Sequence, residues 1–257
     1  MILKKEFPIL EFDSDRTAFI EPNKMIKKID IPECCVITFF RDVIEKKLEE
    51  GLLEQVFTIY SETVNIPVYK TEIEGKPVCL VLGFLGSAGA AAQLEELIAS
   101  GCSKFIVCGG AGVLQKDIAV GHLIIPYSAV RDEGASYHYA EPSREIECSP
   151  EAVNVIEREF ENSDIPFLKA KTWTTDAFYR ETKDKIALRV SEGCVTVEME
   201  AAAFFAVSKF RGVNLGQILY GGDDLSGNEW DGRKWNKRSD IRENLVDLAM
   251  KISLQLI

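Results

Sequence analysis

The segment VEMEAAAFF (197–205) places two carboxylates on either side of a methionine. Glu198, Met199 and Glu200 stand where an apolar run ends and an alanine-rich helix is expected to begin. Carboxylate oxygens at such a junction accept hydrogen bonds from neighbouring hydroxyl groups, such as those of a sugar. The same acids would also interact favourably with the dipole at the N-terminus of the helix, so helix capping is an equally good local explanation.

Another acid follows a pair of glycines in LYGGDDLSG (219–227). Asp223 comes at the end of an apolar run, where a carboxyl group is well placed to transfer a proton. An aspartate that merely forms a turn is the alternative. Because Asp224 adjoins it, spacing alone does not choose between the two acids.

Glycines also follow an apolar run at GGAG (109–112). Gly109 and Gly110 would allow backbone N–H groups to approach an anion closely. The segment is not a P-loop, because no Gly-Lys-Ser/Thr follows, and it lacks the glycine spacing of a dinucleotide-binding loop. A tight turn without a ligand is the alternative.

The segment TWTTDAFY (172–179) carries aromatic side chains that suit a planar ring. Stacking of a base on Phe178 or Tyr179 would contribute about 1–3 kcal/mol. Packing of these rings in the core is the alternative.

Apolar runs alternate with amphipathic segments along the whole chain, which predicts an α/β fold. We expect strands at 35–40, 56–61, 66–75, 77–86, 104–114, 122–130, 167–175, 194–199 and 215–224. We expect helices at 41–52, 88–101, 149–162, 183–191, 200–212 and 238–257. No linker interrupts the sequence, so residues 1–257 are expected to form a single domain, with a central mixed, largely parallel, twisted sheet flanked by helices on both sides.

Ligands of such sheets bind beyond the carboxyl ends of the strands. The glycine pairs, the two glutamates of 197–205 and Asp223 all fall near those ends. The sequence therefore predicts that they meet in one crevice.

Composition argues against several kinds of partner. The net charge of −11 would repel a phosphate backbone, so nucleic acid is not expected. No run of 18 apolar residues predicts a membrane span, and the N-terminus lacks a secretory signal. The seven cysteines form no Cys-x-x-Cys and only two histidines are present, so we expect free thiols in a cytoplasmic protein without a metal site.

Taken together and in this order, these segments resemble the nucleoside phosphorylase superfamily, which includes purine nucleoside phosphorylase, uridine phosphorylase and the methylthioadenosine nucleosidases. The resemblance runs from about Pro77 to the C-terminus, and VEMEAAA is its most specific motif. The run VRDEGASYHY (130–139) is similar to the uridine branch, and DAFY (176–179) is similar to the family's base-site segment.

The resemblance implies an enzyme that breaks the N-glycosidic bond of a nucleoside. Glu198, Met199 and Glu200 would line the ribose pocket, with Glu200 binding the ribose hydroxyls. Phe178 would stack on the base, with Tyr179 beside it. The partners implied are a nucleoside and inorganic phosphate as co-substrate, with no further cofactor, and a homo-oligomer, as a dimer or a trimer of dimers.

The resemblance also implies a dissociative mechanism, in which positive charge builds on the ribose before phosphate attacks C1′. Asp223 would protonate a leaving purine at N7. Arg238 occupies a position compatible with the arginine that supports this acid, and Gly222 stands where a serine is usual.

The phosphate site departs from the family pattern. The usual arginine and serine or threonine positions read Val107 and Gly110. In place of the N-terminal Gly-Asp-Pro-x-Arg signature the chain has IEPNK, with Lys24 as its cation, and Arg41 could supply further charge. Phosphate and water both remain open as acceptors, and a non-catalytic nucleoside-binding or storage protein is a further alternative.

The base also remains open between purine and pyrimidine. The glutamine and arginine with which uridine phosphorylases read uracil correspond to Thr182 and Asp184. The segment 226–240 is polar and rich in aromatic residues, so it is either a lid over the base or an ordinary surface loop. Residues that could redefine the base pocket are Arg180, Trp173 and Trp230.

Overall fold

A mixed sheet of ten strands forms the centre of residues 2–257, the part of the chain that the computed structural model describes. Along the sheet the strand order is β10-β6-β8-β9-β5-β1-β4-β3-β2, and β7 pairs with β6. The strands are β1 (Cys34–Thr38), β2 (Glu54–Tyr60), β3 (Asn65–Ile73), β4 (Lys76–Leu82), β5 (Lys104–Val113), β6 (Leu123–Asp132), β7 (Glu145–Glu147), β8 (Phe167–Thr175), β9 (Cys194–Glu198) and β10 (Asn214–Asp224).

Part of this sheet closes on itself. Because β10 pairs with β5 as well as with β6, the strands β5, β10, β6, β8 and β9 form a ring, and β1, β4, β3 and β2 extend from β5 as an open wing. The pairings of β5 with β10, β6 with β8 and β8 with β9 are parallel. The ring is closed by short antiparallel pairings of β10 with β6 and of β5 with β9.

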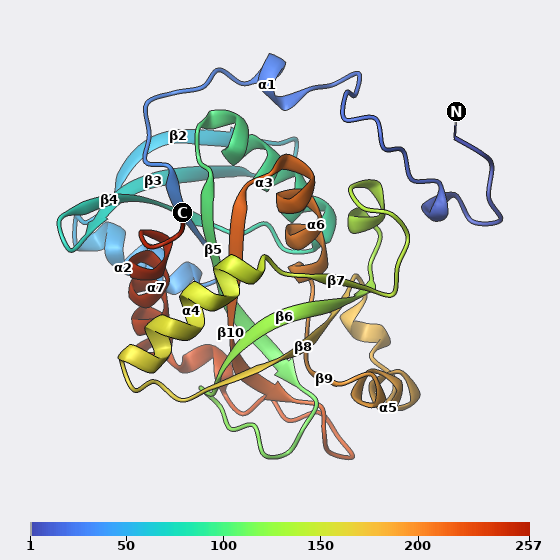
Figure 1. The fold of residues 1–257 in the computed structure, drawn as a ribbon. Coiled ribbons are helices and arrows are strands. Elements are labelled where there is room, and N and C mark those ends of the chain that lie inside the picture. Colours follow the sequence, from blue (N-terminus) through green and yellow to red (C-terminus); the bar gives the residue numbers. More distant parts are fainter. Residues whose placement is uncertain (1) are drawn as a thin grey trace.

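Helices cover both sides of the sheet, as the sequence predicted (Figure 1). On one side α7 packs on α2 and α4, and on the other side α3 packs on α6. No helix within residues 2–257 combines the length and apolarity needed to cross a membrane. The helices are α1 (Pro22–Met25), α2 (Arg41–Glu49), α3 (Ser87–Ser100), α4 (Pro150–Asn162), α5 (Lys183–Ser191), α6 (Ala201–Arg211) and α7 (Ser239–Ser253).

Local signals explain why these elements begin and end where they do. The Ser149 side chain accepts a hydrogen bond from the Ala152 N–H and caps α4, as expected from its place before a proline. Gly212 ends α6 in the left-handed conformation. The expected strand 167–175 and helix 183–191 have the observed bounds of β8 and α5. Strand β7 was not predicted, because three residues are too short to show a period.

All seven cysteines are buried and free, in agreement with the expectation of unpaired thiols. They pack among apolar side chains rather than facing a ligand. Burial raises the pKa of the Cys108 thiol to about 12 and raises the pKa of Cys35. These thiols are therefore core residues.

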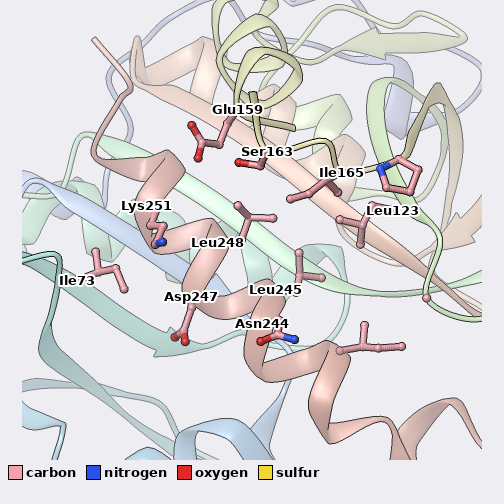
Figure 2. A pocket seen from close by; sticks show the side chains of 13 residues that line it. Ile73, Leu123, Glu159, Ser163, Ile165, Asn244, Leu245, Asp247, Leu248 and Lys251 are labelled. Atoms are coloured by element: carbon pink, nitrogen blue, oxygen red, sulfur yellow. The ribbon is translucent and has the colours of Figure 1, made fainter. Parts of the chain in front are cut away.

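A cavity of about 660 Å³ lies between α4, α7 and the start of β6 (Figure 2). Its walls are mostly aliphatic, and its charged side chains already have partners. Asp247 pairs with Lys47 at 2.8 Å, and Lys251 pairs with Glu74 at 3.1 Å. None of the predicted site residues lines this cavity.

Close packing between β10 and α4 gives a test of the fold. A Cβ at Gly216 would lie 2.8 Å from Ile156 Cδ1 and 3.1 Å from Ala152 Cβ. Gly216→Ala should therefore lower the free energy of unfolding by about 1–3 kcal/mol in urea denaturation. Gly227→Ala is the matched control, because its nearest atom is in ordinary contact at 3.4 Å. Equal stability of the two variants would contradict this packing.

Candidate active site

The junction between β9 and α6 holds the first acid, Glu198, which is only 7% exposed. One carboxylate oxygen accepts hydrogen bonds from the backbone N–H groups of Glu200 (2.7 Å) and Ala201 (2.6 Å). The other accepts from the Thr174 hydroxyl at 2.6 Å. Glu198 therefore binds the N–H groups of the N-cap residue and of the first residue of α6, as the capping explanation expected of an acid at the helix start, whereas the Glu200 side chain makes no cap hydrogen bond.

The second acid, Glu200, is 5% exposed and is bound differently. Its Oε1 accepts a hydrogen bond of 2.6 Å from the Gly86 N–H, just before α3. The Ser87 hydroxyl donates to the Met199 carbonyl at 2.6 Å, which ties the same junction to α3. Glu200 retains acceptor capacity for a ligand, since a carboxylate accepts about four hydrogen bonds.

Burial dominates the electrostatics of this pair. It raises the pKa of Glu198 although three hydrogen bonds stabilise the carboxylate. It also raises the pKa of Glu200, and the negative charge of Glu198 adds to that effect. Two acids held close together out of water favour a ligand that donates hydrogen bonds.

Two adjoining chambers lie over the junction. The smaller has a volume of about 310 Å³ and is lined by both acids, Met199, Arg41, Gly109 and Gly110. The larger has a volume of about 720 Å³ and is lined by Glu198, Met199, Phe178, Tyr179 and Asp223. Gly110, Glu198, Met199 and Trp235 line both chambers, so the glycine pair, the two glutamates and Asp223 meet in one crevice at the carboxyl ends of the strands, as predicted.

Aromatic rings surround the larger chamber. Phe178 and Tyr179 lie with their ring centroids 4.1 Å apart and are 47% and 88% exposed, so they are rim residues rather than core residues. The Trp230 indole N–H donates to Asp223 Oδ2 at 2.7 Å. The segment 226–240 therefore reaches over the chamber and contacts the acid predicted to act on the base.

Trp235 lies between the two chambers and packs on two glycines. A Cβ at Gly110 would come within 3.0 Å of its indole, and one at Gly222 would come within 3.5 Å. The Tyr220 hydroxyl donates to the Trp235 carbonyl at 3.0 Å. Gly110 and Gly222, where serine or threonine was expected, thus leave space for the same tryptophan.

A comparison with protein families agrees with this geometry. The profile of the phosphorylase superfamily matches residues 35–256. The chain belongs to the phosphorylase superfamily. The resemblance seen in the sequence is confirmed, and the enzyme is of the nucleoside phosphorylase type.

Relatives in the superfamily act on different nucleosides. A guanosine phosphorylase of Halorubrum lacusprofundi is 25% identical over 238 residues, which cover 92% of this chain and 98% of that protein. A DeoD-type purine nucleoside phosphorylase of Exiguobacterium sp. is 25% identical over 81% of this chain and 86% of its own length. A uridine phosphorylase of Escherichia coli is 26% identical over 58% of this chain and 65% of its own length.

Solved structures of superfamily members share the fold. Uridine phosphorylase from Vibrio fischeri superposes with a TM-score of 0.73 at 22% identity, over 90% of this chain and 94% of that one. Purine nucleoside phosphorylase from Toxoplasma gondii superposes with a TM-score of 0.74 at 18% identity, over 88% and 92% of the two chains. The predicted α/β fold is thereby confirmed.

Two residues predicted from the superfamily pattern lie away from the crevice. Lys24 belongs to α1, which packs on α3, and it lines neither chamber. Arg238 precedes α7, pairs with Asp240 at 3.8 Å and lines neither chamber. The contact predicted between Arg238 and Asp223 is therefore not formed in this structure.

Another arginine holds the segment of Asp223. Arg233 donates to the Gly222 carbonyl at 2.9 Å and to the Ile118 carbonyl at 2.9 Å. Its backbone is left-handed, with φ +40°. Sequence reasoning missed Arg233, since no spacing rule connects a loop arginine to distant carbonyls.

The other residues considered for the base pocket also fall into two groups, those that line a chamber and those that do not. Trp230 lines the larger chamber, whereas Trp173 is buried and donates from Nε1 to Asp132 at 3.1 Å. Arg180 lines neither chamber. Glu181, which sequence reasoning did not single out, lines the larger chamber beside Asp223.

The burial of Glu200, together with its repulsion by Glu198, predicts a pH-dependent stability. The pKa of Glu200 in the folded state lies above its value in the unfolded state. Between these two pKa values the native state binds more protons than the unfolded state, so the stability of the wild type falls as the pH rises from the lower value to the higher one. Glu200→Gln does not titrate there. The melting temperature of this variant relative to wild type should therefore rise between about pH 5 and about pH 9. A difference independent of pH would contradict the burial of a titrating acid.

Proposed function

We propose that this protein is a nucleoside phosphorylase that transfers the ribose of a nucleoside to inorganic phosphate. The observation that carries the proposal is the position of Met199 on the wall of both joined chambers, with Glu200 next to it on the wall of the smaller one. One chamber has the size and aromatic rim for a base, and the other presents glycine backbone and Arg41. A ribose bound over the junction would have its base in the larger chamber.

Glu200 is the proposed sugar-binding residue. Its carboxylate is fixed by the Gly86 N–H and repelled by Glu198, so hydroxyl donors would relieve an unfavourable environment. Glu198 accepts three hydrogen bonds within the protein, which leaves it less capacity for the sugar. In the proposal, Glu198 holds the start of α6 in place and contributes negative charge beneath the ribose.

Cleavage proceeds by departure of the base before attack. The C1′–N bond breaks, its electron pair leaves with the base, and the base takes a proton from Asp223 at N7. The two acids stabilise the positive charge that develops on the ribose. A phosphate oxygen then forms the new bond to C1′.

The proposed phosphate position is the smaller chamber, near Gly109, Gly110 and Arg41. Arg41 is the first residue of α2, a helix of nine residues whose N-terminus favours an anion. The fork of Arg41 can bind two phosphate oxygens at once. Lys24, placed elsewhere in this chain, is not part of this proposal.

Hydrolysis is the second candidate, and Trp235 is the observation that favours it. The indole occupies the space beside Gly110, where phosphorylases carry a hydroxyl side chain, and Val107 offers no charge. A smaller acceptor such as water needs neither group. Whether cleavage depends on phosphate therefore distinguishes the two candidates.

The relatives favour a purine as the base. The guanosine phosphorylase relative spans nearly the whole chain, and Thr182 and Asp184 replace the residues expected for uracil. We further propose a cytoplasmic enzyme, consistent with its free thiols, that needs no cofactor beyond phosphate. We also propose a homo-oligomer, as a dimer or a trimer of dimers.

Release of free base tests the proposal directly. Guanosine, inosine, adenosine and uridine are each incubated with the protein, with and without phosphate, and the base is measured by chromatography. Base released only with phosphate, together with ribose 1-phosphate, is the expected result. Release at the same rate without phosphate would establish hydrolysis, and no release from any nucleoside would overturn the enzymatic proposal.

Asp223→Asn should lower kcat for a purine nucleoside by about 10²–10⁴-fold, because the amide cannot supply the proton to N7. The fold should be preserved, since the Asp223 side chain accepts its hydrogen bond from Trp230 near the surface. Asp224→Asn is the neighbouring control and should retain more activity. Equal losses in both variants, or a parallel loss of melting temperature and rate, would contradict this role.

A further inference from the structure

Gln217 is a buried amide in the wall of the smaller chamber that the proposed mechanism does not use. It belongs to β10 and is only 1% exposed. Within residues 2–257 its Oε1 is buried without a hydrogen-bond partner. A buried carbonyl oxygen that receives no hydrogen bond is unfavourable, so this atom indicates a ligand that donates one.

A second buried glutamine shows how an amide with a structural role is bound in this protein. Gln93 on α3 is also 1% exposed. Its Oε1 accepts a hydrogen bond from the Phe84 N–H at 2.8 Å, and its Nε2 donates to the Leu82 carbonyl at 2.8 Å. Gln93 thus fastens the end of β4 to α3, whereas the oxygen of Gln217 makes no such contact with the described part of the chain.

The register of the sheet places Gln217 at the proposed acceptor position. In the parallel pairing of β10 with β5, Gln217 lies opposite Val107 and Leu219 lies opposite Gly109. Side chains alternate between the two faces of a strand, so Gln217 shares the face of Leu219 and Gly109, which line the same chamber. Val107 is apolar, so Gln217 supplies this part of the wall with a polar group.

The chemistry of an amide defines the anions that fit it. An amide offers an acceptor oxygen beside N–H donors, and its end group turns about a soft torsion. Phosphate and arsenate carry both a hydroxyl group and an unprotonated oxygen at neutral pH, so they complement both sides of the amide. Sulfate has no hydroxyl group there. Glu198 and Glu200 line the same chamber and would repel its additional unprotonated oxygen.

We propose that Gln217 selects the acceptor anion: the smaller chamber takes oxyanions that carry a hydroxyl group, such as phosphate and arsenate, and rejects sulfate. This inference rests on the proposed function and defines its class of acceptor. The hydroxyl group of the anion donates to Gln217 Oε1, and the amide N–H donates to the adjacent oxygen. The proton stays on that hydroxyl group during the transfer, and an unprotonated oxygen forms the bond to C1′.

The test measures the KM of phosphate and the inhibition constant of sulfate on wild type, Gln217→Met and Gln55→Met. Methionine is similar to glutamine in length but is only a weak acceptor. Gln55 on β2 is the control, since it is exposed and lines neither chamber. On wild type the inhibition constant of sulfate should exceed the KM of phosphate by at least about tenfold, as expected for a hydrogen bond to a charged group.

Gln217→Met should raise the KM of phosphate by a similar factor and bring the ratio of the two constants close to one. Gln55→Met should leave both constants unchanged. Arsenate should replace phosphate in supporting base release by wild type. Sulfate that binds wild type as tightly as phosphate, or an unchanged KM of phosphate in Gln217→Met, would overturn the inference while phosphate-dependent cleavage leaves the proposed function standing.

Thermal unfolding without anions separates selection from a structural role. Gln217→Met should melt no lower than wild type, because it removes an oxygen that has no partner. Gln93→Met should melt lower, because two buried backbone groups lose their partners. A lower melting temperature of Gln217→Met with weaker binding of every ligand would overturn the inference, and so would a rise confined to the KM of the nucleoside.

The proposed function can fail separately. If wild type releases no base, or releases it without phosphate, the protein is not a phosphorylase. Calorimetric titration of phosphate, arsenate and sulfate into wild type and Gln217→Met then decides the inference. Binding of phosphate and arsenate but not sulfate, weakened in Gln217→Met, would support it, and any other order would overturn it.

Discussion

The site depends on two carboxyl groups held side by side, out of water, where β9 meets α6. Glu198 is retained there because the first N–H groups of the helix bind it, and Glu200 is retained by the N–H before α3. This arrangement requires β9 and α6 to pack closely at the helix start. The fully buried alanines after Glu200, Ala201 to Ala203, permit that approach because they add little volume. Packing of α6 thus offsets the repulsion between the two carboxyl groups. Hydrogen bonds from the hydroxyl groups of a sugar would reduce that repulsion.

Trp235 packs on two glycines that are distant in the sequence, at positions where the resemblance predicts hydroxyl side chains. Gly110 lies on β5 and Gly222 on β10, yet both lack a side chain where the indole packs. Arg233 fastens the same segment to the carbonyl of Gly222. Both positions at which the resemblance predicts a hydroxyl side chain therefore face the same indole.

Much of the fold could be predicted from the sequence, because strong apolar periods, glycine stops and the Ser149 cap act over a few residues. The junction acids and Asp223 were also predictable, since they lie at the ends of β9 and β10, whose carboxyl ends meet. The place of Phe178 and Tyr179 near the base was expected only from the resemblance, because they follow the end of β8 and the local pattern fits core packing as well. Closure of the ring was not, because it depends on short antiparallel pairings without a local signature. Glu181 was missed for a similar reason: only the folded chamber places it beside Asp223.

The central claim is that Glu200 holds the ribose hydroxyls. A double-perturbation cycle tests this claim: kcat/KM is measured for inosine and for 2′,3′-dideoxyinosine, each on wild type and on Glu200→Gln. On wild type, loss of both hydroxyls should lower kcat/KM by at least about tenfold for a charge-assisted hydrogen bond. On Glu200→Gln the same loss should have far less effect, because the partner carboxylate is already gone. An equal penalty on both proteins would show that the hydroxyls are bound elsewhere and would contradict the account.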